Sequence, residues 1–170
     1  MREPVSTNTS HSPKGGAGRG LPLGLRNNNP PNIRRGKSRW QGEVLPQRGN
    51  RLLGAERLGS ASDGGQGGEG AFCRFEDLSW GIRAAFCILR TYRDKYKAVC
   101  IEDIITRWAP PTENDTRKYI SDLCRLTGFG GKERLTENDW PKLVKQMALL
   151  ESGAVLSEDV IRKGFALFKG

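Results

Sequence analysis

The sequence has very little of the residues from which most catalytic and metal sites are built. Its only histidine is His11, close to the start of the chain, and none of its four cysteines forms a Cys-x-x-Cys pair. The separations along Cys73, Cys87, Cys100 and Cys124 are too long for ordinary zinc-ligand spacing. The lack of a second histidine also excludes Ser-His-Asp and Cys-His catalysis. We therefore expect no metal, no cofactor, and mostly buried thiols.

Long apolar runs and a secretory segment are missing as well. No stretch approaches the roughly 18 apolar residues that span a bilayer, and the segment 1–20 lacks the apolar core of a signal peptide. We expect a protein made in the cytoplasm without membrane insertion, which another factor must deliver to the cell wall or the virion. The glycine-rich stretch 63–70 is not followed by the Gly-Lys-Ser/Thr of a phosphate-binding loop.

The net charge of +9 indicates an anionic partner without identifying it. Nucleic acid and the acidic polymers of a bacterial envelope both fit this charge. Lysine and arginine are spread along the chain, and no aromatic-basic platform or recognition-helix motif is evident. Nucleic-acid binding is therefore kept as a third hypothesis, behind the two developed below.

Composition divides the chain into two parts. The segment 1–70 holds most of the glycines, whereas the remainder carries nearly all of the helical apolar pattern. We expect a disordered basic leader over 1–20 and a single helical domain over 21–170, with a flexible glycine-rich loop near 59–70.

Apolar residues at a period of 3.6 predict a mainly α fold. The first long helix should begin near Ser79, with Asp77 or Ser79 as its cap, and continue to Tyr96. Further helices are expected over 101–108, from Asn114 or Asp115 to Gly128, from Asp139 or Trp140 to Ser152, and after Ser157. A short hairpin over 33–44 is the only strand pairing that the sequence favours.

An asparagine–proline cluster, Leu25 to Arg35, is the most unusual stretch of the chain. The segment 27–32 consists only of asparagines and prolines, so it cannot lie inside a helix or a central strand. It predicts a rigid turn whose amides either cap local backbone or face a ligand.

This stretch resembles the opening of phage and prophage proteins that are labelled virion structural or lysozyme-like. Their pattern begins Gly-(Ile/Leu)-Arg-Asn-Asn-Asn-Pro-Gly-Asn-Ile-Arg, and here Pro31 replaces the second glycine. If that glycine adopts a positive φ, proline must reshape the loop. The resemblance covers about residues 24–153 and implies a small lysozyme-like domain. The motifs that carry it are Gly24 to Arg34, Trp40 to Gly42, Phe72 with Phe75, Gly81 to Ala84, Trp108 to Thr116, and Glu151 with Gly153.

Glu151 is the leading candidate for a catalytic acid. It ends an apolar helical run, where the negative end of the helix dipole and the apolar neighbours disfavour its charged form. A solvated glutamate that simply ends a helix is the alternative. The run Leu-Leu-Glu-Ser-Gly is similar to the catalytic helix of lysozyme-like glucosaminidases and lytic transglycosylases. Because the asparagine-rich turn precedes this glutamate instead of following it, the resemblance implies a circular permutation.

Two further carboxylates are alternative candidates. Glu113 lies in a turn before a predicted helix, where an ionised base or a capping role fits it better than an acid role. Glu43 follows Trp40 and either faces the same cleft or is an ordinary loop charge. Expected sugar-binding residues are the asparagines of the turn with nearby arginine and aromatic side chains: Asn28, Asn29, Asn32, Arg34, Trp40 and Tyr119.

The first hypothesis is therefore a phage-type peptidoglycan glycosidase, either a lysozyme or a lytic transglycosylase, with glycan strands as its partner. The second is a non-catalytic virion or wall-binding protein that uses the same groove and contacts other virion proteins. Both require that Glu151 and the asparagine–proline turn lie across one groove.

Overall fold

A computed structural model describes residues 21–37, 39–45 and 71–170. The predicted leader over 1–20 and the predicted glycine-rich loop near 59–70 lie outside these residues. The described part of the chain is organised in six α-helices and a short 3₁₀ helix, so the mainly α prediction is confirmed. The elements are α1 (Leu23–Arg26), α2 (Leu78–Tyr96), α3 (Ile101–Trp108), α4 (Thr116–Thr127), η2 (Glu137–Asp139), α5 (Trp140–Ser152) and α6 (Glu158–Lys169).

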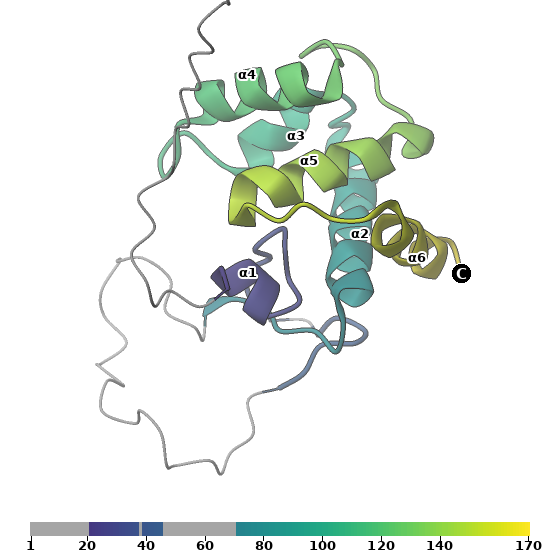
Figure 1. Cartoon of the computed structure of the whole chain (residues 1–170). Coiled ribbons are helices and arrows are strands. Elements are labelled where there is room, and N and C mark those ends of the chain that lie inside the picture. The colour runs from purple at the N-terminus through teal and green to yellow at the C-terminus, as the bar shows by residue number, and fades with distance from the viewer. Residues whose placement is uncertain (1–20, 38, 46–70) are drawn as a thin grey trace, which may run out of the picture.

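Helix α5 crosses the middle of the molecule (Figure 1). Helices α3 and α4 lie on one side of it, and α1 lies beside its C-terminal end. The axes of α2 and α5 cross at a steep angle, and α2 packs against α6. This arrangement brings the start of the described chain next to the last turn of α5, where a Cβ built on Gly24 would stand 2.8 Å from the Cβ of Ser152.

The helix boundaries follow the predicted capping residues. Asp77 accepts hydrogen bonds from the backbone N–H groups of Ser79 and Trp80 at the start of α2. Asp115 caps α4, and Gly128 ends it in the left-handed region at φ 73°. Gly153 ends α5 in the same conformation at φ 66°. These caps satisfy backbone groups that every helix terminus leaves without a partner.

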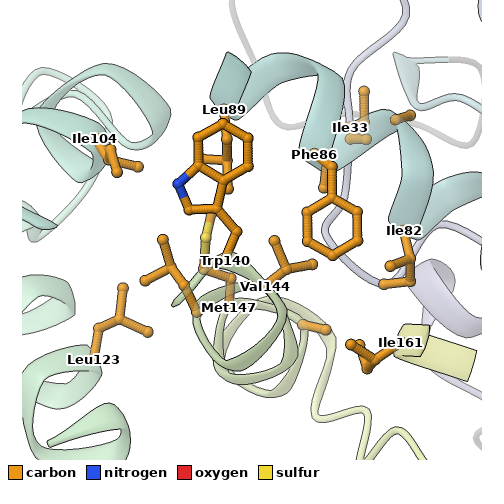
Figure 2. Close-up of a cluster of buried hydrophobic side chains, with 14 of the residues drawn as sticks. Ile33, Ile82, Phe86, Leu89, Ile104, Leu123, Trp140, Val144, Met147 and Ile161 are labelled. Carbon is orange, nitrogen blue, oxygen red and sulfur yellow. The ribbon is translucent and has the colours of Figure 1, made fainter. Parts of the chain in front are cut away.

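The core lies between α2, α3, α4, α5 and α6, with Leu123 as the fully buried apolar residue of α4. Figure 2 shows side chains of α2 and α5 meeting around Trp140, which is 3% exposed. Burial of each such side chain stabilises the fold by roughly 1.5–3 kcal/mol. The largest fully buried side chains of these helices are Ile82, Phe86, Leu89, Ile101, Ile104, Ile105, Leu123, Leu143, Val144, Met147 and Ile161.

The hairpin expected over 33–44 is wrong. Two isolated antiparallel bridges, from Arg34 to Phe72 and from Glu43 to Phe75, pair this segment with the stretch 71–76 instead of with itself. The thin apolar alternation of the segment did not specify its partner, which follows the glycine-rich stretch further along the chain. Strand pairing in the described residues goes no further than these bridges.

Two smaller features differ from what the sequence predicts. The 3.6-residue period places Tyr96 on the apolar stripe of α2, yet it is 42% exposed and carries the Arg107 guanidinium 4.0 Å from its ring centre. Helix α1 is not predicted, because a single helical turn has no measurable periodicity. In the asparagine–proline loop the left-handed residues are Asn28 (φ 50°) and Asn32 (φ 52°), on either side of the two prolines.

Candidate functional site

A groove of about 460 Å³ lies between the asparagine–proline loop and the C-terminal end of α5. One face, which we call the loop wall, is lined by Asn32, Ile33, Arg34, Gly36, Lys37, Trp40 and Phe72. The opposite face, the helical wall, is lined by Trp108, Ala109, Pro110, Glu113, Asn114 and Glu151. Helix α2 contributes Ile88 and Tyr92.

Asn32 joins the two walls directly. Its backbone N–H donates to the carbonyl of Asn29 at 2.8 Å, closing a turn over the two prolines. Its side-chain Nδ2 donates to the backbone carbonyl of Glu151 at 2.9 Å, a contact between residues 119 positions apart. The expected juxtaposition of the asparagine–proline turn and Glu151 is therefore present.

The other two predicted asparagines, Asn28 and Asn29, stabilise the loop by hydrogen bonds to backbone groups and do not line the groove. Asn29 is fully buried, and its Nδ2 donates to the carbonyls of Ile33 and Cys73 while its Oδ1 accepts from the Ile33 N–H. Asn28 donates through Nδ2 to the carbonyl of Phe75 at 2.9 Å. These amides replace the regular ladder that the segment lacks.

The Glu151 carboxylate is half-buried on the last turn of α5. Its Oε1 accepts a hydrogen bond from Trp108 Nε1 at 2.9 Å and another from the Tyr119 hydroxyl at 3.0 Å. Both donors come from neighbouring helices, α3 and α4. Among the described residues no donor reaches Oε2. The two bonds fix the carboxylate while one oxygen stays available to a ligand.

Tyr119 stays protonated beside this carboxylate. Burial raises the pKa of its hydroxyl well above the usual range, and the negative charge and hydrogen bond of Glu151 raise it further. Tyr119 does not line the main groove, but it borders a smaller depression on the other side of Glu151, together with Asn114, Asp115 and Lys118. Its hydroxyl therefore acts as a fixed donor to Glu151.

Glu43 does not line the groove. Its side chain is 2% exposed, its Oε2 accepts the backbone N–H of Trp40 at 3.0 Å, and its Oε1 lies 3.5 Å from Arg35 Nε. The turn beneath it passes through Gly42 at φ 71°, where an added Cβ would stand 2.3 Å from the Trp80 ring. The geometry thus makes Glu43 a support for the turn that presents Trp40 to the groove.

Glu113 lines the groove on the helical wall and faces Arg34 of the loop wall. Its Oε2 accepts a hydrogen bond from an Arg34 guanidinium nitrogen at 3.1 Å. The side chains are 54% and 71% exposed, so the ion pair is open to solvent. Of the predicted residues, the groove therefore gathers Glu151, Glu113, Asn32, Arg34 and Trp40.

The comparison with curated proteins finds a phage relative. The chain is 36% identical over 146 residues to Protein P5 of Pseudoalteromonas phage PM2, covering 84% of this chain and 79% of that protein. The chain belongs to the family of phage PM2 Protein P5. No protein-family model matches the sequence. The phage part of the predicted resemblance is confirmed at this level, while the name Protein P5 states no activity.

Two further findings bear on what this member of the P5 family can bind. Within the described part of the chain, no three His, Cys, Asp or Glu side chains gather as a metal site would require. No helix of the described residues is long and apolar enough to cross a membrane. All four cysteines lie in the described residues as free thiols, with Cys73 and Cys100 buried.

Trp108 and Tyr92 are groove residues that the sequence does not predict as site residues. The helical period predicts that Trp108 faces the core; it does pack against the core, but it is half-buried and turns its indole N–H to Glu151. An indole needs a partner for its N–H when it is buried, and this requirement was the available signal. Tyr92 was assigned to the apolar stripe of α2, and it both packs on the core and borders the groove of this P5-family protein.

Proposed function

We propose that the chain is a phage-type peptidoglycan glycosidase in which Glu151 is the general acid. The observation that carries the proposal is the position of Glu151, a half-buried carboxylate on a groove that also holds Asn32, Trp40 and Trp108. Amides and aromatic rings on a groove wall suit sugars, which combine hydroxyl and acetamido groups with apolar ring faces. The protein would act at the cell wall or in the virion once delivered there.

In the proposed reaction, Glu151 is protonated on Oε2 and donates that proton to the glycosidic oxygen as the bond from this oxygen to the anomeric carbon breaks. Trp108 and Tyr119 hold Oε1, so the acid keeps one orientation. The positive charge that develops at the anomeric carbon needs a second group. Either Glu113 on the same wall of the groove or the acetamido group of the substrate can supply it. Attack by water then gives hydrolysis, and attack by a hydroxyl of the same sugar residue gives an anhydro product; in both cases the attacking O–H group passes its proton to the Glu151 carboxylate.

The test compares the wild type with Glu151→Gln on purified cell walls. Turbidity should fall with the wild type, and soluble muropeptides should appear, whereas Glu151→Gln should be at least about 100-fold slower because a general acid contributes about that much. Glu158→Gln, at an exposed position on α6, is the matched control and should keep wild-type activity. Circular dichroism of all three proteins checks the fold. Equal lysis by wild type and Glu151→Gln would remove Glu151 from the role.

A non-catalytic wall-binding or virion protein is the second candidate. The observation that favours it is the pair of donors on Oε1, which use Glu151 as a hydrogen-bond acceptor. In a binding site Glu151 would likewise accept hydrogen bonds from sugar hydroxyls through Oε2, with no proton transferred. Retention on insoluble peptidoglycan without release of soluble fragments would support this candidate over the enzyme.

A further inference from the structure

The Arg34–Glu113 ion pair joins the two walls of the groove at side chains that solvent can reach. Arg34 is 71% exposed and Glu113 is 54% exposed, with 3.1 Å between guanidinium nitrogen and carboxylate oxygen. Exposed pairs of this kind contribute little to stability, because water and salt compete with them. A ligand carboxylate can therefore replace Glu113 on Arg34 at small cost.

The backbones that carry the two side chains are fixed, although the side chains are exposed. Arg34 forms the bridge to Phe72, and hydrogen bonds on either side hold the pairing, from Cys73 N–H to the Ile33 carbonyl at 2.9 Å and from Arg35 N–H to the Ala71 carbonyl at 2.8 Å. Glu113 donates its N–H to the Pro110 carbonyl at 3.0 Å within a proline-bounded turn. The Arg34 side chain is thus anchored on fixed backbone, which lowers the entropic cost of binding an anion.

The loop wall is also the most basic part of the groove. Arg34 and Lys37 are the cations among its lining residues, and both belong to the basic run 34–39. Arg35, in the same run, lies beside buried Glu43, so its guanidinium is less available to a ligand than that of Arg34. A planar guanidinium binds a carboxylate through two parallel N–H donors, so Arg34 is suited to an acidic ligand in particular.

We propose that Arg34 recognises a carboxylate on the glycan ligand, and that Glu113 occupies this position as an internal substitute until the ligand displaces it. The site accordingly takes acidic glycans in preference to neutral ones. The inference rests on the proposed function for its ligand class and deepens it by naming a specificity residue. In peptidoglycan the carboxylate comes either from the lactyl group of the muramic acid or, where that group is amide-linked, from the stem peptide.

The experiment measures binding in the Glu151→Gln background, so that no ligand is consumed. Three probes of equal glycan length are compared by calorimetry: a neutral chito-oligosaccharide, a peptide-free glycan with free lactyl groups, and a glycan that carries stem peptides. The parent protein should bind at least one acidic probe about tenfold more tightly than the neutral one. Preference for the peptide-free or the peptide-bearing probe identifies the source of the carboxylate.

Two substitutions in this background act in opposite directions. Arg34→Gln should lose the preference for acidic glycans while its affinity for the neutral probe stays the same. Glu113→Gln should bind the acidic probes about threefold more tightly, since the competing internal carboxylate is removed. Arg39→Gln removes the same charge from an exposed neighbour that does not line the groove, and it should retain most of the preference.

The proposal is overturned if all three probes bind equally, or if Arg34→Gln and Arg39→Gln weaken binding by the same factor, since the effect would then be the general positive field. It is also overturned if Glu113→Gln weakens binding of the acidic probes. If all three probes bind equally and the wild type lyses cell walls, only this inference is refuted and the proposed function stands. A clear acidic preference without lysis would remove only the catalytic function.

Discussion

The two walls of the groove are held by different interactions. In the helical wall, Trp108 and Glu151 project from helices whose opposite faces are buried in the apolar core, and hydrogen bonds add orientation to positions that packing already fixes. In the loop wall, the backbone has two isolated bridges, and buried or half-buried side-chain amides make up for the missing ladder.

This difference separates the residues that build the site from those that face a ligand. Apolar packing is distributed over many contacts, so a polar change at the edge of the helical wall leaves the core in place. The amide bonds of the loop wall are few, and each buried group left without a partner costs about 1–3 kcal/mol. Stability of the loop wall should therefore depend on fewer residues, which the predictions below test from the largest effect to the smallest.

The largest loss is expected from Gly81→Ala, where α2 meets the loop wall. An added Cβ would stand 2.2 Å from the carbonyl oxygen of Asn28. Relief of this clash requires the backbone of α2 or of the asparagine–proline loop to move. We expect a loss of about 3 kcal/mol in the free energy of unfolding, as for overpacking of a closed interior. Urea denaturation measures it. Gly36→Ala, with no atom within 4 Å of the added carbon, is the control and should change little.

The next largest loss is expected from Asn29→Ala. The change leaves the Cys73 carbonyl and the Ile33 N–H without their buried Asn29 partner, whereas the Ile33 carbonyl keeps the Cys73 N–H as a donor. We expect a loss of about 2–3 kcal/mol in the free energy of unfolding. Asn28→Gly, in which glycine tolerates the left-handed backbone at φ 50°, removes bonds nearer to solvent and should cost about 1 kcal/mol. Equal losses in the two variants would show that burial does not determine how much these amide hydrogen bonds contribute to stability.

The same contrast explains what the sequence could predict. Helices α2 to α6 were found because the apolar period, Asp77, Asp115, Gly128 and Gly153 are local signals that the core reinforces. The bridges to 71–76 were missed because register across a long insertion is decided by tertiary contacts that leave no local pattern.

The candidate site was predicted in part for the same reason. Sequence placed Glu151 at a helix end and Asn32 in a turn, and both lie on the groove. It could not separate Asn32 from Asn28 and Asn29, because like amides in one turn differ only in the direction that the folded backbone gives them. Glu43 was misjudged in the same way, since its burial behind Trp40 depends on the stretch 71–76.

A smaller effect is expected at Tyr119, which supports Glu151 of the helical wall. Tyr119→Phe keeps the packing and removes one hydrogen bond to Glu151, so the loss at neutral pH should be about 1 kcal/mol. The raised pKa of Tyr119 adds a pH dependence: its contribution is complete below the ordinary value of 10.0 and is lost as pH rises from there through the folded pKa. Urea denaturation across the alkaline range should show a shallower decline in Tyr119→Phe. Tyr96→Phe, exposed on α2, should keep the decline of the wild type.

The smallest effect on stability is expected at the ligand-facing pair. Because Arg34 and Glu113 are largely exposed, Arg34→Gln and Glu113→Gln should each change the free energy of unfolding by less than about 1 kcal/mol. Added salt should shrink even this difference, since screening weakens exposed pairs first. A loss comparable to that of Asn29→Ala would place the pair among the supports of the loop wall, and the two walls would then differ less than their contacts indicate. A small loss leaves Arg34 free to exchange Glu113 for a ligand while Asn29 holds the backbone beneath it.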